Sequence, residues 1–303
     1  MTKVTFYAAS ILFVGIASTV SAAASSAAAP PVPTAIPNHG RPYTIAGLPQ
    51  SDYTMDAVYE HGTLTPLSCA GTAAYIIAPK GAVDPARRWV WISNLFLALN
   101  DKDCGPVMQR FYVEGALAKG FHVAGIDVGA SCGSPKGAEV YEAFYQMLLK
   151  EYHLAPKARM IGQSNGGLIA YGYAFRYPDH VDRVLGLFPA TDLASWPGLD
   201  RLCGPFSPVG LEYGLGRAEM ETRLKEFNPI DNIAPLVKAR VRAYHVHGTA
   251  DDVVPLEPNS AEFARRYKML GGDIVVEIEE GGNHGAPLTA FFESRDALAF
   301  LLE

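Results

Sequence analysis

Residues 160–168 read MIGQSNGGL and contain a complete Gly-x-Ser-x-Gly pentapeptide centred on Ser164. Residues 157–161 read as a short strand, and residues 168–176 read as a helix that stops at Tyr177-Pro178. A strand, a sharp turn that carries serine and a helix together form a nucleophile elbow. Glycine two positions either side of the serine lets strand and helix approach closely, and the strained turn exposes the hydroxyl. The stretch therefore predicts an exposed serine nucleophile.

A serine nucleophile needs a base and an acid that orients the base. When the serine lies on an elbow, the acid and then the histidine follow it along the chain. Residues 241–248 read as a strand, and the loop after it carries Asp251 and Asp252. The carboxyl end of this strand is expected at the same edge of the sheet as the elbow. Asp192, after a strand at residues 184–188, is a third candidate for the acid.

The base is expected in the loop after the last strand, which we place at residues 273–278. The glycine-rich loop that follows presents His284, and such a loop carries an imidazole across the edge of the sheet. His247, at the end of the preceding strand, is expected to position the acid loop. The histidines at positions 39, 61, 122, 153 and 180 lie in no such context and are expected to be structural.

An oxyanion hole of backbone N–H groups is the remaining part of such a site. One donor is the amide of the residue after the nucleophile, Asn165, whose side chain is a further candidate to donate to a substrate oxygen. The second donor comes from the loop after the third strand. Residues 88–93 read as that strand, which points to the amide of Asn94 or Leu95.

Several motifs occur in one order along the chain and carry a resemblance to a known family. They are a Trp-x-Trp at 89–91, GFHVAGIDV at 120–128, Gly-Ser-Pro at 133–135, the elbow, Ser-Trp-Pro-Gly at 195–198, His-Gly-x-x-Asp-x-x-Val-Pro at 247–255 and Gly-x-His-Gly at 282–285.

Over residues 85–290 the chain resembles exported bacterial α/β-hydrolases related to the prolyl-oligopeptidase catalytic domain. The resemblance implies a mostly parallel, doubly wound sheet and a Ser-His-Asp triad. It also favours Asp251 as the acid, with Asp252 as the alternative, and it implies a serine hydrolase that needs no cofactor and no metal.

Composition is consistent with this fold and excludes nucleic acid as a partner. The chain of 303 residues is 49% hydrophobic and 18% charged, and its length suits one large α/β domain or two small ones. Its net charge is −6, and no basic run is present to bind phosphates. From about residue 73 strand and helix patterns alternate, with helices expected at 137–152, 167–177, 258–270 and 287–302.

The first residues read as a signal peptide, with Lys3, a short apolar run at 4–20 and small residues at 21–24. We therefore expect a signal peptide at 1–22, a disordered Ala/Pro-rich segment at 23–40 and an α/β-hydrolase domain at 41–303. The mature protein is expected to be secreted or periplasmic and not membrane-bound.

Export would make the four cysteines candidates for disulfides. An even count allows two bridges in three connectivities, and Cys104 with Cys132 is the pair that we expect at the entrance to the site. The other two are Cys69 and Cys203.

Residues 193–234 break the alternation between the sixth and seventh strands and are expected to form a small cap. Aromatic side chains in such a cap stack on substrate rings or pack on apolar atoms. Trp196 and, in the loop after the third strand, Phe96 are the candidates for the substrate pocket.

Three functions fit these observations. The first is a secreted carboxylesterase that acts on an acyl or methyl ester of a small molecule or a carbohydrate. The second is a serine peptidase of the prolyl-oligopeptidase type, although only about forty residues separate the signal region from the first strands and a propeller domain would not fit there. The third is a non-catalytic binding protein, which is disfavoured because such proteins commonly lose a triad member.

Overall fold

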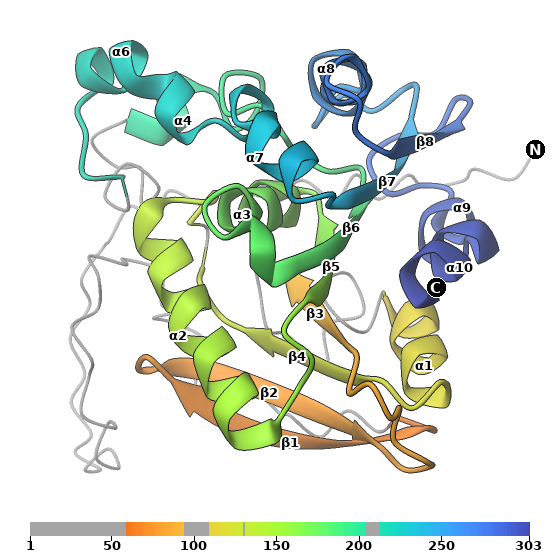
Figure 1. Ribbon diagram of the computed structural model, residues 1–303. Helices are drawn as coiled ribbons and strands as arrows, with labels where there is room; N and C mark the ends of the chain where they lie inside the picture. The colour runs from red at the N-terminus through yellow and green to blue at the C-terminus, as the bar shows by residue number, and fades with distance from the viewer. Residues whose placement is uncertain (1–58, 94–108, 130, 204–212) are drawn as a thin grey trace, which may run out of the picture. The chain divides into compact units, whose positions relative to one another are not determined.

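The computed structural model describes residues 59–93, 109–129, 131–203 and 213–303. All of them belong to a unit that spans Ala35–Glu303. Its centre is an eight-stranded sheet with the order β1-β2-β4-β3-β5-β6-β7-β8 (Figure 1). The strands are β1 (Gly62–Cys69), β2 (Thr72–Pro79), β3 (Trp89–Ser93), β4 (His122–Ile126), β5 (Ala158–Gln163), β6 (Val181–Leu187), β7 (Arg242–Gly248) and β8 (Ile274–Glu279).

The sheet is antiparallel at one edge and parallel elsewhere. β1 pairs with β2 and β2 pairs with β4 in antiparallel register, whereas every pair from β4 through β3 to β8 is parallel. The hairpin between β1 and β2 turns through Ala70 and Gly71, both with positive φ, as a two-residue hairpin turn requires. The predicted mostly parallel, helix-wound sheet is therefore confirmed.

Helices cover both faces of the sheet. On one face, α1, α9 and α10 pack against one another and on the strands, and on the other face α2 packs on α3 and α7 on α8 (Figure 1). The helices are α1 (Arg110–Ala118), α2 (Pro135–Tyr152), α3 (Asn165–Ala174), α4 (Leu199–Cys203), α6 (Arg217–Phe227), α7 (Ile233–Lys238), α8 (Glu262–Met269), α9 (Leu288–Phe292) and α10 (Arg295–Leu302), with shorter turns η3 (Pro178–His180), η4 (Pro229–Asp231) and η5 (Glu257–Ala261).

Local sequence explains where the helices beside the site begin. Ser134 caps α2, because its Oγ accepts a hydrogen bond from the Gly137 amide and Pro135 occupies the first helical position. α3 is apolar on all sides, and every one of its ten residues is buried. The helix that carries the elbow is thus fixed by packing on all faces.

Two of the predicted helices differ from the structure. The single helix expected at 287–302 is two helices, since the chain breaks at Glu293 and restarts where the Ser294 hydroxyl accepts from the Ala297 amide. The helix expected at 258–270 begins earlier, as the π-helical turn η5, before α8. In both places a polar side chain or a wider turn interrupts an apolar period that reads as continuous.

Between β6 and β7, where the sequence predicts a cap, lie α4, α6, η4 and α7. An apolar cluster joins this segment to the elbow and the acid loop: Leu193, Trp196 and Met220 belong to the same buried cluster as Leu168 of α3 and Val254. Within the described parts of the chain no helix is long and apolar enough to cross a membrane.

Candidate active site

Ser164 lies on a strained turn between β5 and α3. Its backbone has φ 52° and ψ −120°, a conformation that side chains rarely adopt. The turn is tied to the end of β6, because the Ser164 amide donates to the Leu187 carbonyl (3.0 Å) and the Ser164 carbonyl accepts from the Ala190 amide (2.9 Å). A Cβ on Gly162 would lie 2.7 Å from the Gly166 carbonyl oxygen. The two glycines of the pentapeptide therefore meet, as the elbow requires.

Ser164, His284 and Asp251 form a continuous chain of hydrogen bonds. The Ser164 Oγ lies 3.0 Å from the His284 Nε2, and the His284 Nδ1 lies 2.8 Å from an Asp251 carboxylate oxygen. The other Asp251 oxygen accepts from the amides of Val253 (3.0 Å) and Val254 (2.8 Å). Three residues separated by up to 120 positions thus meet at the carboxyl ends of β5, β7 and β8.

The Asp251 carboxyl is held in its charged form. Burial by itself raises its pKa, but hydrogen bonds from His247, His284 and the Val254 amide outweigh burial and hold the pKa well below its usual range. A carboxylate beside the Nδ1 of His284 places the proton on that nitrogen and leaves Nε2 to accept the Ser164 hydroxyl proton. The arrangement therefore has the polarity that a serine nucleophile needs.

The loops that carry the acid and the base are packed directly together. The Gly282 carbonyl accepts from the Ala250 amide (2.8 Å), and a Cβ on Gly248 would lie 2.1 Å from the same oxygen. On its other side the His284 ring meets the Phe188 ring edge-on, at 4.6 Å between centroids. The Asp251 carboxylate and the Phe188 ring both contact the imidazole, whose side chain remains 16% exposed.

The alternative acids lie elsewhere. Asp252 is exposed, next to the buried Asp251. Asp192 accepts from the Ala194 amide (3.1 Å) and from the Asn228 side chain (2.8 Å), and so holds the start of the segment between β6 and β7. Neither contacts His284 among the interactions of the described residues.

The predicted oxyanion donors are only partly within the described residues. Asn165 is the first residue of α3, where a backbone N–H has no partner within the helix and the helix dipole favours negative charge. Asn94 and Leu95 lie outside the described residues, and so does Phe96. The Asn165 side chain departs from the prediction: it is buried and its Nδ2 lies 3.0 Å from the Cys132 Sγ, so it faces the protein and not a substrate.

Of the cysteines, Cys104 lies outside the described residues, so its predicted bridge to Cys132 stays a prediction. No disulfide joins Cys69, Cys132 and Cys203 to one another. The Cys132 carbonyl accepts from the hydroxyl of Tyr213, which lies just before α6 (2.8 Å). The loop that contacts Asn165 thereby also anchors the segment between β6 and β7.

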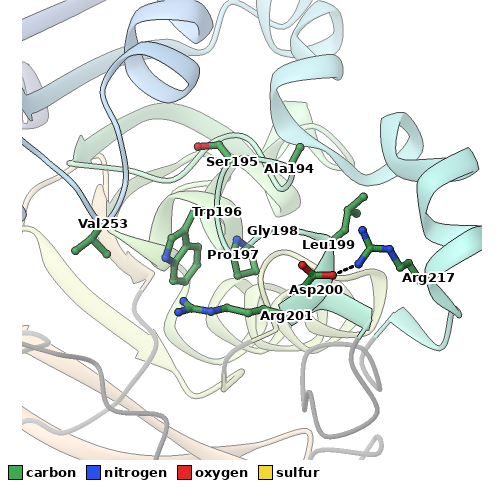
Figure 2. A pocket seen from close by; sticks show the side chains of 10 residues that line it. All are labelled: Ala194, Ser195, Trp196, Pro197, Gly198, Leu199, Asp200, Arg201, Arg217 and Val253. Atoms are coloured by element: carbon green, nitrogen blue, oxygen red, sulfur yellow. Dashed lines mark ion pairs between the residues drawn. The ribbon is translucent and has the colours of Figure 1, made fainter.

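Trp196 lines a cavity of about 600 Å³ that opens beside the acid loop (Figure 2). Val253, whose amide binds Asp251, forms part of its wall, and Arg217 points at Asp200 across it. Ser164 and His284 are not among the described residues that line it. The cavity therefore lies next to the acid loop and does not surround the Ser164 hydroxyl.

Sequence reasoning missed the buried side chains behind Asp251, namely those of Tyr171, His245 and Ser260. One signal was available. His245 and His247 are two apart on a strand and therefore share a face, and each imidazole on a buried face needs a hydrogen-bond partner.

Comparison with known proteins places this geometry in a family. The model of the prolyl oligopeptidase family matches residues 138–303, which is more than half of the chain and contains Ser164, Asp251 and His284. The chain belongs to the prolyl oligopeptidase family. No sequence among the curated proteins matches it significantly.

Solved structures share the fold. A truncated carbohydrate esterase from gut microbiota is 20% identical with a TM-score of 0.61, over 81% of this chain and 97% of that one. Carboxyl esterase 2 from the mycorrhizal fungus Tuber melanosporum is 18% identical with a TM-score of 0.54, over 82% and 87%. A puromycin-hydrolyzing peptidase from Mycobacterium tuberculosis is 17% identical with a TM-score of 0.57, over 79% of this chain but only 38% of that one. The chain is thus a serine hydrolase of the α/β-hydrolase fold, and its neighbours include both esterases and peptidases.

Proposed function

We propose that this serine hydrolase is an exported carboxylesterase with Ser164, His284 and Asp251 as its catalytic triad. The observation that carries the proposal is the unbroken pair of contacts from the Ser164 Oγ through His284 to Asp251, at 3.0 and 2.8 Å, with the serine on an elbow. Each atom stands where acyl transfer needs it.

In the proposed reaction the Ser164 Oγ attacks the ester carbonyl carbon while the His284 Nε2 takes the hydroxyl proton. The Asn165 amide stabilises the oxyanion, and Asp251 stabilises the imidazolium. His284 then returns the proton to the leaving alcohol, so the acyl group stays on Ser164. A water molecule then attacks the acyl-enzyme carbonyl while His284 takes its proton. His284 returns this proton to the Ser164 Oγ as the bond from the acyl carbon to Oγ breaks, which releases the acid and restores the serine.

Two observations support an ester over an amide substrate. The carbohydrate esterase and the fungal carboxyl esterase are matched over 97% and 87% of their lengths, whereas the puromycin-hydrolyzing peptidase is matched over 38% of its length. The cavity at Trp196 combines an aromatic face with charged groups from Asp200, Arg201 and Arg217. Such a lining suits the apolar face and the hydroxyl edge of a sugar ring, so we propose an acyl or methyl ester of a carbohydrate.

The alternative is a serine peptidase, because the family to which the chain belongs takes its name from one. The chemistry on an amide would use the same atoms. Turnover of short p-nitrophenyl esters and of Pro- or Ala-anilides separates the two. We expect turnover of the esters. Robust anilide cleavage with inert esters would overturn the preference.

The catalytic assignment is tested with a fluorophosphonate probe. We expect the probe to label the wild type and to leave Ser164→Ala unlabelled. Labelling that persists in Ser164→Ala, or an unlabelled wild type, would contradict the assignment.

The substrate class is tested at Trp196. We expect Trp196→Leu to raise KM for an acetylated oligosaccharide by about tenfold, the loss of one aromatic contact of roughly 1.4 kcal/mol, and to leave kcat on p-nitrophenyl acetate unchanged. Equal changes on both substrates would argue against a sugar in the cavity.

Export is tested at the N-terminus of the protein made in a secreting bacterial host. We expect mass spectrometry to find the mature chain in the periplasm or medium, beginning near residue 23. A full-length chain retained in the cytoplasm would rule out the signal peptide.

A further inference from the structure

A buried chain of polar side chains runs from Asp251 to the helix that follows Ser164. The His247 Nε2 lies 3.5 Å from an Asp251 oxygen, and the Ser260 Oγ lies 2.7 Å from the His247 Nδ1 and 2.9 Å from the His245 Nδ1. The His245 Nε2 lies 2.7 Å from the Tyr171 hydroxyl. We call Tyr171, His245, Ser260 and His247 the relay. All four have no exposed surface.

With both imidazoles neutral, one backbone carbonyl sets the direction of every hydrogen bond in the relay. The His247 Nε2 lies 2.8 Å from the Val254 carbonyl, which only accepts, so this nitrogen carries a proton. In a neutral imidazole Nδ1 then accepts from the Ser260 hydroxyl. The Ser260 oxygen in turn accepts from the His245 Nδ1, and the His245 Nε2 accepts from Tyr171. The donors therefore point one way, from α3 to the acid loop.

The surroundings of His245 keep it neutral, as this direction requires. Burial, together with the neighbouring His247, lowers the pKa of His245 to about 3. Burial likewise raises the pKa of Tyr171 well above its usual value, so the phenol keeps its proton. In the half of the relay nearest α3, Tyr171 is thus a donor hydroxyl and the His245 Nε2 is an acceptor.

The relay connects two elements that are otherwise separate in sequence. Tyr171 lies seven residues after Ser164 on α3, and Ser260 lies on η5, after the acid loop. The residue before Ser260, Asn259, also holds the segment that enters the cap, because its Oδ1 accepts from the Thr191 amide (2.9 Å). A π-helical turn lets these neighbours reach in different directions.

We propose that Tyr171, His245, Ser260 and His247 are positioning residues that hold the Asp251 loop in register with the nucleophile helix. This proposal rests on the proposed function, since it assigns the relay to the same triad. The relay touches no substrate. It acts by fixing the Val254 carbonyl and the Asp251 carboxylate, and through them the imidazole of His284. Misplacing a catalytic group by a fraction of an ångström lowers the rate of the chemical step.

The first test reads the protons directly and does not depend on activity. NMR of wild-type protein labelled with ¹⁵N in histidine distinguishes the two neutral tautomers. We expect His245 to carry its proton on Nδ1 and His247 on Nε2. The opposite neutral tautomer at either residue would overturn the relay.

The second test is kinetic and uses a matched pair on one helix. Tyr171→Phe removes the relay hydroxyl. Tyr173, whose side chain is also buried, donates its hydroxyl to Glu142 (2.9 Å), and the hydroxyl lies 3.0 Å from the His180 Nδ1, so Tyr173→Phe removes a hydroxyl away from the acid loop. We expect Tyr171→Phe to lower kcat on a p-nitrophenyl ester by about tenfold with KM unchanged, and Tyr173→Phe to leave kcat unchanged. We expect Ser260→Ala, which breaks the relay at its centre, to lower kcat by about 10- to 100-fold.

A third readout separates positioning from general loosening of the core. The proton shared by His284 and Asp251 gives a downfield ¹H resonance, which we expect to shift in Tyr171→Phe and to stay in place in Tyr173→Phe. An active wild type with equal kinetics and spectra in the two variants would refute the relay and leave the triad intact. A wild type that neither turns over esters nor reacts with the probe would instead refute the proposed function, and the tautomers would still decide the relay.

Discussion

The residues around the acid loop, which we call the buried side, and helices α4 and α6, the exposed side, hold their polar side chains in opposite ways. On the buried side His247 of β7, Asp251 and Ser260 are almost fully buried and bind one another or the backbone through side-chain hydrogen bonds. Before β7, α4 and α6 carry ion pairs whose side chains are about half exposed, such as that of Arg223 with Glu226. Buried hydrogen bonds strengthen one another and fix positions, whereas exposed pairs contribute little. The difference separates a region that fixes the positions of Asp251 and His284 from one whose ion pairs water already screens.

The largest effect on kcat is expected from replacing the acid, Asp251, on the buried side. Asp251→Asn keeps the shape but loses the charge that stabilises the His284 imidazolium, so we expect kcat to fall by about 10³- to 10⁴-fold. The matched control is Asp252→Asn, one residue along and exposed, which should leave kcat unchanged. Ester turnover measures both. A large loss of kcat in Asp252→Asn alone would identify Asp252 as the acid.

The second prediction uses pH to destabilise buried histidines, above all His245 of the relay. Since the folded pKa of His245 is about 3, the unfolded state binds a proton near its ordinary pKa while the folded state does not. Stability is therefore expected to fall as pH falls, by up to about 2 kcal/mol between pH 6.5 and 5. His122, whose pKa burial and Arg87 lower to about 4, acts in the same direction. Urea unfolding at several pH values measures the change, and a flat profile in this window would contradict the neutral, buried state of these histidines.

A third pair of variants tests backbone packing on the two sides. Gly248→Ala drives a Cβ into the Gly282 carbonyl, whereas nothing lies within 4 Å of a Cβ on Gly216, at the start of α6. We expect Gly248→Ala to lower the free energy of unfolding by about 1–3 kcal/mol and to lower kcat, because it separates the acid and base loops. Gly216→Ala should change stability by less than about 1 kcal/mol and leave kcat unchanged. Equal losses of stability and kcat in both variants would contradict the difference in backbone packing between the buried side and the exposed side.

The smallest effect is expected at an exposed ion pair. Arg223→Gln removes the pairs with Glu219 and Glu226 on α6. Because water already screens these charges, we expect no measurable change in Tm or in kcat. Thermal denaturation and ester turnover check this, and a clear drop in Tm would show that the exposed side is held by its charges after all.

The elements that the sequence predicts well are those whose signal is local. Three features can each be recognised from a segment of ten residues or fewer: the Gly-x-Ser-x-Gly stretch, the strand before the acid loop and the glycine-rich loop at His284. Their meeting follows from a parallel sheet, in which the carboxyl ends of strands share one edge. The structure brings Ser164, Asp251 and His284 together in this way.

What the sequence could not supply is contact between distant side chains. Nothing near Tyr171 indicates that its hydroxyl binds His245, 74 residues away, and Ser260 lies in a stretch that reads as an ordinary helix. From the sequence the Asn165 side chain is a candidate to bind a substrate, because its partner in the structure, the Cys132 thiol, is 33 residues upstream and nothing local indicates that contact. The sequence also does not indicate the break between α9 and α10 at Glu293, because the helical spacing of apolar residues continues across it.

The backbone of Ser164 also limits which mutations the site survives. Threonine carries the same hydroxyl, but its branched Cβ disfavours a φ of 52° far more than that of serine does. Alanine would adopt this conformation at lower cost yet leaves no nucleophile. The turn therefore tolerates a substitution that removes the hydroxyl more readily than one that keeps the hydroxyl on a branched side chain, so its shape alone does not preserve the hydroxyl.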